Sequence, residues 1–366
     1  MTEGPVPSDT PLAPPAPRRR HRIAFWLILS MFSAFFAEVT CGSQPFVFFN
    51  APGWLLVVPL YGLHTLVLAT IVWRWGRVRF NCLFLAGVLF GLYEAYVTKV
   101  LWAPPWNEKP VTLGGLAVPE TIMLAFYWHA FMAFIVPLFA AERLLLPSTD
   151  TLDALGPRFR RLAAGWLPVI VLPLMCGPVN GVAVKSWPAA LGSTLGCTGV
   201  LMLAVILWTK VLKGARFTFR QLLPTNGEFV VLALLLLGDY VFCGFVMNRE
   251  KMPSWGPQVT LWVVYAIVIS LFVWAMRRPL AGATGDAPVG PRPDRWRTWG
   301  ALAAVFALTS LAASLLLGAY RNFVFLVLWL PGMLVGSVTF LTVAIRLFLP
   351  RRPKPPPVLP ADGSAP

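Results

Sequence analysis

The chain of 366 residues is 57% hydrophobic and only 12% charged, and its mean hydropathy is +0.70. Soluble domains of this size carry about twice that share of charged residues, so soluble enzymes, secreted disulfide scaffolds and disordered regulators are disfavoured. The net charge of +15 is spread over short Lys and Arg clusters between apolar segments. This pattern is typical of a membrane protein, and we expect no nucleic-acid partner.

Apolar segments recur along the chain, each near the length of about 20 residues that an α-helix needs to cross a bilayer. They cover residues 23–40, 53–73, 81–102, 118–141, 162–184, 188–209, 228–247, 258–276, 299–319 and 323–345. The sequence therefore predicts an all-α fold, a polytopic membrane helix bundle with about ten transmembrane helices.

Positive charges alternate between the loops. Of the 30 Lys and Arg residues, 24 lie in segments 18–22, 74–79, 143–161, 210–220, 277–297 and 346–354. Cytoplasmic loops carry such an excess, so we predict that both termini are cytoplasmic and that the protein lies in a bacterial inner membrane. Anionic lipids at the cytoplasmic face are expected partners of the basic segments, and further membrane proteins are compatible ones.

We divide the chain into regions by composition. Residues 1–22 are predicted to be a disordered, Pro-rich, basic tail, and residues 350–366 a second disordered Pro-rich tail. Residues 23–146 form an amino-terminal membrane unit of four helices, and residues 147–349 a carboxy-terminal unit of six. The five cysteines show no CxxC pair, so we expect no metal site, and no pattern points to a cofactor.

Ionisable side chains inside the first four predicted spans are the main candidates for function, because each costs energy in a bilayer. At a rise of about 1.5 Å per residue, Glu38 and Glu94 lie about 20 Å from the cytoplasmic side. His64 and His129 lie near mid-membrane by the same measure. We therefore predict that Glu38, Glu94 and His129 converge on one outward-facing polar pocket.

The third span shows how Glu94 can face inward. Gly87, Gly91 and Glu94 fall on one stripe by their spacing, and the glycines allow another helix to approach closely. Lys99 lies about 140° around the helix from Glu94, so it either joins the pocket or extends to the outer surface. The uncharged loop at residues 41–53, which contains Asn50, is expected to cover the pocket.

Two further polar residues complete the candidate pocket. Asp239 stands alone in an apolar segment. Asn180 lies within Gly177–Gly181, where glycine and proline are expected to interrupt the fifth span. The tenth span contains Pro331-Gly332 at the corresponding place. Interrupted helices at matching positions of two inverted halves are typical of secondary transporters.

The amino-terminal third resembles a group of uncharacterised multi-pass bacterial membrane proteins. The shared elements are Glu38, Gly42-Ser43-Gln44-Pro45, Asn50, Tyr61-Gly62, an aromatic-Gly-x-x-Glu run that ends at Glu94, Lys99 and His129. The resemblance covers about residues 36–143 and implies a multi-pass membrane fold.

A glutamate pair with a later histidine is typical of the CAAX-type intramembrane proteases, and Glu94 with His129 resembles this pattern. The resemblance implies a hydrolase in which Glu94 and His129 activate water. This chain departs from that pattern at two positions. Ala95 stands where the pattern has a second glutamate, and Ala125, four residues before His129, stands where it has a phenylalanine.

Three functions follow from these patterns. The favoured one is a transporter or permease of an unidentified small solute, with Glu94 and Asp239 as proton or cation sites. The alternative is an intramembrane enzyme that acts on a lipid-linked or peptide substrate, with Glu94 as general base and His129 as acid or orienting partner. A third is a structural subunit or assembly factor of a membrane complex.

Overall fold

The computed structural model describes residues 16–76, 78–156, 167–212, 217–247, 249–278, 295–316 and 320–349. Within these ranges, seven helices are long and apolar enough to cross a membrane. Three shorter apolar helices lie at Phe80–Tyr96, Leu172–Val184 and Gly300–Leu315. The chain is thus an all-α multi-pass membrane protein, while the count of ten crossings and the side on which the termini lie stay predictions.

The first four helical segments contain several π-helical stretches. In chain order they are α1 (Arg19–Ala34) with η1 (Phe35–Val39), η3 (Gly53–Val57) with α2 (Val58–Thr70) and η4 (Ile71–Trp75), α3 (Phe80–Gly91) with α4 (Tyr93–Tyr96), and α5 (Val118–Thr121) with η5 (Ile122–Ile135) and α6 (Val136–Leu145). A short 3-10 turn, η2 (Val47–Phe49), lies in the loop after η1.

The remaining elements are mostly long α-helices. They are α7 (Asp150–Ala154), α9 (Leu167–Val184), α10 (Trp187–Leu212), α11 (Phe219–Leu222), α12 (Asn226–Val241) with η6 (Phe242–Val246), η7 (Arg249–Lys251), α13 (Trp255–Arg277), α14 (Arg295–Leu316) and α15 (Arg321–Phe348). One antiparallel pair of two-residue strands, β1 (Thr112–Leu113) and β2 (Leu116–Ala117), departs from the all-helical prediction in the loop before α5.

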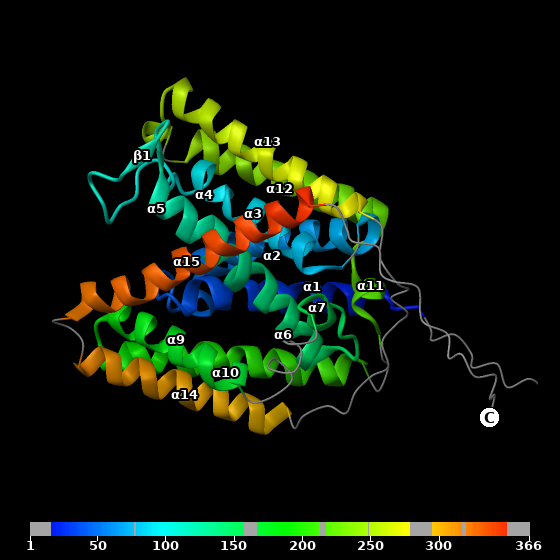
Figure 1. The fold of residues 1–366 in the computed structure, drawn as a ribbon. Helices are drawn as coiled ribbons and strands as arrows, with labels where there is room; N and C mark the ends of the chain where they lie inside the picture. The colour runs from blue at the N-terminus through cyan, green and yellow to red at the C-terminus, as the bar shows by residue number, and fades with distance from the viewer. Residues whose placement is uncertain are drawn as a thin grey trace, which may run out of the picture.

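The helices run side by side in layers (Figure 1). Helices α9, α10 and α14 form one layer, α12 and α13 lie on the opposite side, and α1, α2 and α3 lie between them. Helix α15 lies across η5, which also packs against α3. Helices of the predicted six-helix unit therefore contact those of the four-helix unit directly.

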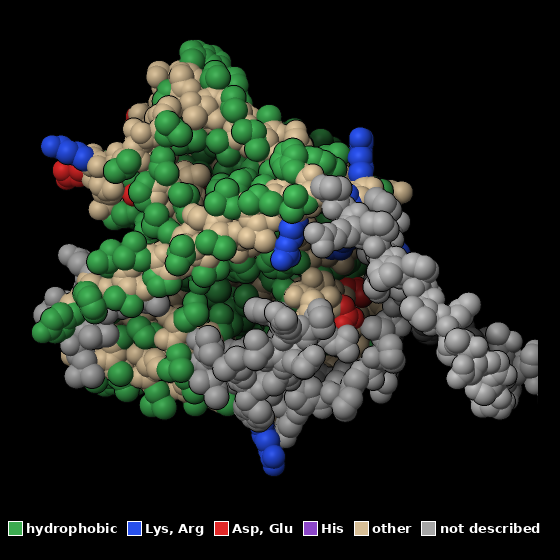
Figure 2. All heavy atoms as spheres, viewed as in Figure 1, with side chains coloured by type: hydrophobic (Ala, Val, Ile, Leu, Met, Phe, Trp, Pro, Cys, Tyr) green, Lys and Arg blue, Asp and Glu red, His purple; other side chains and the backbone are tan. Residues whose placement is uncertain are grey.

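Burial separates central from peripheral spans. The apolar window of the Arg19–Val39 span is 67% buried, whereas that of Asn226–Val246 is 11% buried. Hydrophobic side chains are spread over the helices in Figure 2, and few charged side chains lie among them. Exposed leucines on α12 match a lipid-facing helix, because no water-soluble surface would carry so many. The first helical segments therefore form the interior of the bundle.

The predicted glycine stripe on α3 makes a close helix contact. A Cβ atom on Gly87 would lie 2.6 Å from the Cα atom of Ala130, and one on Gly91 would lie 2.5 Å from the Cα atom of Ala125. Both partners belong to η5. Glu94, one turn farther along, therefore faces η5 as predicted.

The expected interruption of the fifth and tenth spans is wrong. Helix α9 continues through Pro173 and Pro178, and α15 continues through Pro331. The glycines serve helix packing instead: a Cβ on Gly181 would clash with the carbonyl oxygen of Ser310 on α14. Likewise, Gly332 lies against Tyr127 of η5. Small residues that admit a neighbouring helix need no unwound backbone.

The amino-terminal tail is shorter than predicted, because α1 begins at Arg19 rather than after residue 22. The backbone N–H of Arg18 donates to Nδ1 of His21, and Arg22 forms an ion pair with Glu228 at 2.8 Å. These contacts stabilise the first helical turn. The predicted carboxy-terminal tail lies outside the described residues.

Candidate functional site

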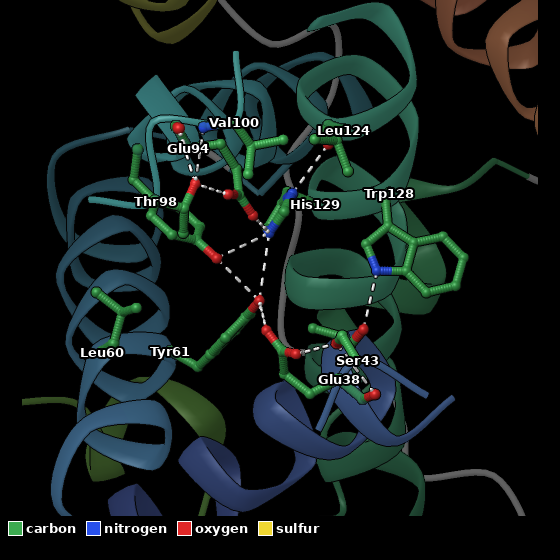
Figure 3. Close-up of polar contacts among 12 residues, drawn as sticks. Glu38, Ser43, Leu60, Tyr61, Glu94, Thr98, Val100, Leu124, Trp128 and His129 are labelled. Carbon is green, nitrogen blue, oxygen red and sulfur yellow. Dashed lines mark hydrogen bonds and ion pairs between the residues drawn. The ribbon is translucent and has the colours of Figure 1, made fainter. Parts of the chain in front are cut away.

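A cluster of titratable side chains joins the first four helical segments. We call it the carboxylate–histidine cluster; its members are Glu38, Tyr61, Tyr93, Glu94 and His129. They come from η1, α2, α4 and η5 (Figure 3). Three of them, Glu38, Glu94 and His129, are the residues that the sequence predicts to converge.

The hydroxyl of Tyr61 lies at the centre of the cluster. It donates to Oε1 of Glu38 at 2.5 Å, and it lies 2.9 Å from the hydroxyl of Tyr93 and 3.4 Å from Nε2 of His129. Tyr61 therefore connects the carboxylate of η1 with the histidine of η5. Gly62 beside it lets α1 approach, because a Cβ there would clash with Ser30.

The second carboxylate contacts the histidine directly. Oε1 of Glu94 lies 3.2 Å from Nε2 of His129, and the Tyr93 hydroxyl lies 3.2 Å from the same nitrogen. Nδ1 of His129 lies 3.0 Å from the carbonyl oxygen of Leu124, which can only accept. This contact assigns a proton to Nδ1, so the Nε2 lone pair faces Glu94 in the neutral ring.

A proton must therefore lie between Glu94 and His129. Two acceptors at 3.2 Å would repel each other, so either the imidazole is protonated and the carboxylate charged, or the carboxyl is protonated and the imidazole neutral. Both states keep the hydrogen bond. This arrangement is the geometry of a general acid–base pair, in which the proton can move to or from a bound reactant.

Hydroxyl groups hold the outer oxygens of both carboxylates. Thr98 donates to Oε2 of Glu94, and Ser43 donates to Oε2 of Glu38. The Sγ atom of Cys41 lies 3.1 Å from the Ser43 hydroxyl. Desolvation raises the pKa of the Cys41 thiol to about 12, and the Glu38 carboxylate adds to the shift. Cys41 is therefore a thiol, not a thiolate nucleophile, at neutral pH.

The cluster is buried at its centre and reaches the surface at two places. Tyr61, Tyr93 and His129 are at most 2% exposed, whereas Ser43 beside Glu38 and Thr98 beside Glu94 are exposed. The loop between η1 and η3 forms the Ser43 side, and its Phe46 and Phe49 rings lie against Gly192 and Gly196 of α10.

Irregular helix geometry surrounds the cluster. Glu38 lies in the π-helix η1, and His129 lies in η5, a π-helix of 14 residues. The indole N–H of Trp128 donates to the carbonyl of Ala37 at 2.9 Å and ties the two segments together. The cluster thus joins two of the π-helical segments of the bundle.

Two other predicted site residues lie near the cluster but have different partners. His64 stacks on Phe90 at 4.6 Å, and its ring nitrogens contact the Leu60 carbonyl and the Tyr240 hydroxyl. Asn50 accepts from the backbone N–H of Gly53 and donates to the Phe46 carbonyl, so it shapes the loop at the start of η3. His64 borders the cluster, whereas Asn50 does not reach it.

Lys99 does not join the cluster or extend to the outer surface. Its side chain is fully buried, and its ammonium donates to the carbonyls of Cys243 and Met247 at the end of η6. Its own backbone has a φ of 63°, a left-handed conformation. A cation at free helix carbonyls stabilises that helix end, so Lys99 has a structural position.

Asn180 forms a separate, neutral polar cluster. Its Nδ2 donates to the Val39 carbonyl at 2.6 Å, and its Oδ1 accepts from Ser310 at 2.7 Å and from Ser193 at 3.2 Å. We call Asn180, Ser193 and Ser310 the Asn180 cluster. It joins α9, α10 and α14 to the end of η1.

Asp239 lies apart from both clusters. It is half-buried on the peripheral helix α12, and its Oδ1 accepts from the thiol of Cys243 at 3.6 Å. The structure thus brings together Glu38, Glu94 and His129 and leaves Asn50, Lys99, Asn180 and Asp239 outside.

Sequence reasoning missed the two tyrosines as members of the site. Tyr61 and Tyr93 carry no charge at neutral pH, so a search for ionisable residues in membrane spans does not select them. Tyr61 shares a face with His64 and immediately precedes Gly62, and Tyr93 immediately precedes Glu94. Their position beside these residues was the signal available in the sequence.

Known proteins extend the membrane assignment. An uncharacterized protein of Archaeoglobus fulgidus is 28% identical over 329 residues, which make up 89% of this chain and 98% of the relative. No solved structure matches the chain. A family model matches residues 27–352, and the chain belongs to that family, an uncharacterized membrane protein family.

Proposed function

We propose that the protein is an intramembrane enzyme that uses the Glu94–His129 pair for acid–base chemistry. The observation that carries the proposal is the contact of 3.2 Å between Oε1 of Glu94 and Nε2 of His129, with two tyrosine hydroxyls at the same nitrogen. The reaction class that fits is hydrolysis or group transfer at a carbonyl carbon.

Each group has a role in such a reaction. In the state with charged Glu94 and protonated His129, the Glu94 carboxylate takes a proton from the attacking water, and His129 gives its Nε2 proton to the leaving group. The Tyr93 hydroxyl donates to the oxyanion that develops on the substrate. Glu38, bonded to Tyr61 and Ser43, orients the Tyr61 hydroxyl at the Ser43 side of the cluster.

The surroundings favour an uncharged reacting group. Among the described residues, no Lys or Arg side chain contacts the carboxylate–histidine cluster, and Lys99 donates to backbone carbonyls instead. In either protonation state of the Glu94–His129 pair the cluster has no net positive charge, so it would not attract a phosphate. A lipid-linked ester or a peptide bond in an apolar segment is therefore the substrate class that we propose.

Transport of a small solute has less support. Glu38 lies near the end of the α1–η1 segment and Glu94 near the end of the α3–α4 segment. The cluster is therefore a layer at one end of the bundle and not a path along its length. Helices α9 and α15 are continuous. Asp239 on the periphery of the bundle is the feature that keeps transport as the second candidate. A purely structural role is the third candidate, and it would not require the proton that Glu94 and His129 share.

Location and topology belong to the same proposal. The excess of Lys and Arg in alternate loops supports a cytoplasmic membrane with both termini inside. The carboxylate–histidine cluster then lies near the outer face, and its substrate enters from the outer leaflet. Archaea, like bacteria, have a cytoplasmic membrane, so the archaeal relative agrees with this location.

The test compares substitutions in proteoliposomes. Purified protein should hydrolyse p-nitrophenyl acetate or p-nitrophenyl laurate, and Glu94→Gln and His129→Asn should abolish the activity with unchanged thermal stability. Asp239→Asn is the matched control, because it removes a carboxylate from a span outside the cluster; its rate should equal wild type. Two results together would overturn the enzyme proposal in favour of transport. One is a hydrolysis rate no higher than that of the Glu94→Gln variant, and the other is proton-coupled uptake of a solute that needs Asp239.

A further inference from the structure

The turn after α4 has an unusual backbone. We call residues 97–103 the Lys99 turn. Its central residue, Lys99, has a φ of 63°, in the left-handed region that residues other than glycine rarely adopt. The Lys99 carbonyl accepts from the backbone N–H groups of Trp102 at 3.1 Å and Ala103 at 2.9 Å, so the turn closes on this residue. Such a conformation persists only where the surrounding contacts hold it.

The side chain of Lys99 makes contacts that hold the turn. It is 0% exposed, and its ammonium donates to the carbonyl of Cys243 and, at 2.6 Å, to that of Met247. Both carbonyls lie at the end of η6, where a helix leaves carbonyl groups without intrahelical partners. These bonds therefore fasten the Lys99 turn to η6, a segment more than 140 residues farther along the chain.

The same turn carries a residue that contacts Glu94. The Thr98 hydroxyl donates to Oε2 of Glu94 and lies 2.8 Å from the Glu94 backbone carbonyl oxygen (Figure 3). A charged carboxylate is the stronger acceptor of the two, so it takes the single hydroxyl proton. The backbone N–H of Val100 donates to the same hydroxyl oxygen at 3.3 Å. The Thr98 hydroxyl is thus held between the backbone of the turn and the carboxylate.

The two oxygens of the Glu94 carboxylate have different partners. Oε1 lies 3.2 Å from Nε2 of His129, and Oε2 accepts from Thr98. Together these contacts restrict the rotation of the carboxylate plane. If the Thr98 hydroxyl moved away, the carboxylate would rotate more freely, and its contact with His129 would weaken.

We propose that Lys99 is a positioning residue for the Glu94–His129 pair and that it acts through Thr98. The Lys99 ammonium contacts neither member of the pair, but it holds the turn that places the Thr98 hydroxyl on Glu94. The inference rests on the proposed enzyme function for its effect on a rate. The placement of Glu94 against His129 can be measured without any substrate.

Substitutions measure the effect on the rate. Lys99→Met removes the hydrogen bonds of the ammonium, and kcat for p-nitrophenyl laurate should fall about tenfold per folded molecule with an unchanged KM. Thr98→Val removes the hydroxyl and should cause a similar fall. Because both changes act on the same contact, the double variant should be no slower than the slower single variant. Lys99→Gln keeps one donor group, so it should lower both kcat and stability by less.

Lys185 offers a matched control. It has a φ of 58°, close to that of Lys99, but its side chain is exposed directly after α9. Lys185→Met therefore puts the same residue on the same kind of backbone without breaking a buried contact, and its kcat should equal wild type. An equal loss in the Lys99→Met and Lys185→Met variants would overturn the proposal, because the backbone conformation alone would then explain it.

A measurement on His129 separates this inference from the enzyme function. In protein whose histidines carry an NMR-active nitrogen isotope, the His129→Asn variant identifies the Nε2 signal of His129, which responds to protonation and hydrogen bonding. Lys99→Met and Thr98→Val should shift this signal, and Lys185→Met should not. Such a shift in a protein without esterase activity would support the positioning role while the enzyme proposal failed. An unchanged signal in Lys99→Met, or additive losses of kcat in the double variant, would overturn the positioning role while wild-type hydrolysis stood.

Discussion

The carboxylate–histidine cluster and the Asn180 cluster are neighbours with opposite chemistry. Both are buried polar groups among apolar helices, and they are joined through η1, where Glu38 precedes Val39. In the Asn180 cluster, every proton belongs to one group: two serine hydroxyls donate to Oδ1, and Nδ2 donates to a carbonyl. In the other cluster, the proton between Glu94 and His129 has two possible positions.

This difference teaches how to separate packing from chemistry in a membrane protein. A neutral cluster with fixed donors and acceptors stabilises helix contacts. Its contribution to stability does not depend on pH, because it contains no titratable group. A cluster of titratable groups gives the same stabilisation only for a defined number of protons. Substitutions should therefore affect stability at Asn180 and chemistry at Glu94.

The largest effect is expected for Glu94→Gln. The amide can still accept from Thr98 and donate to Nε2 of His129, so the fold should persist, but it cannot exchange a proton with the imidazole. The hydrolytic rate should fall about 100-fold to 10,000-fold, the contribution of a positioned acid–base group. Initial rates and the thermal unfolding midpoint measure both effects. A large fall in the midpoint with an unchanged rate per folded molecule would make Glu94 a packing residue.

Reactivity of Cys41 sharpens the comparison, because this thiol reports the charge of Glu38. A pKa of about 12, against an ordinary 9.0, lowers its thiolate fraction at neutral pH about 1,000-fold. Since the fraction of thiolate rises with pH below the pKa, maleimide labelling should accelerate about tenfold per pH unit from neutral pH upward. Glu38→Gln should speed labelling, because it removes a negative charge that raises the pKa. Peptide mass spectrometry locates the label, and indifference to Glu38→Gln would argue that Glu38 is uncharged.

Asn180→Leu should disrupt the Asn180 cluster and lower the stability of the fold. The substitution removes three hydrogen bonds and leaves the Val39 carbonyl and two serine hydroxyls without this partner. We expect a loss of about 2–4 kcal/mol in the free energy of unfolding, the cost of leaving buried polar groups unpaired. Unfolding in mixed detergent micelles measures the loss. The rate per folded molecule should stay at the wild-type level, and a lower rate would place Asn180 in the chemistry.

The smallest effects distinguish two serines. Ser193→Ala removes a buried hydroxyl of the Asn180 cluster and should cost about 1 kcal/mol of stability. Ser43→Ala removes an exposed hydroxyl and should change stability by less than about 0.5 kcal/mol. Ser43 donates to Glu38, so its substitution should instead slow hydrolysis. Parallel unfolding and rate measurements decide, and the reverse pattern would contradict the division between the clusters.

Much of the fold follows from the sequence. Apolar segments of membrane-spanning length predict most of the described long helices to within a few residues, because a helix satisfies its own backbone in a bilayer. The third span is the exception, since its helix ends at Tyr96 and not at residue 102. The stripe of Gly87, Gly91 and Glu94 predicts a close helix contact, since it depends only on helix periodicity, and the structure shows η5 as the partner. Convergence of Glu38, Glu94 and His129 follows from their depth along neighbouring helices.

Other features depend on three-dimensional packing that periodicity does not encode. Pro173 and Gly181 suggest a broken helix, but α14 packs against the glycine surface and the helix stays continuous. Lys99 finds its partners in η6, more than 140 residues away in sequence. Tyrosine hydroxyls become part of the cluster only once α2 and α4 are placed beside η5.

The π-helical segment η5 gives the site a dependence on chain length. Its backbone bonds join residues five apart, so the segment accommodates more chain than an α-helix of equal rise. Rewinding it by one residue would rotate everything beyond by about 100°. His129 would then point away from Glu94, although each amino acid remained the same. Spacing within this segment is therefore as much a part of the site as the side chains themselves.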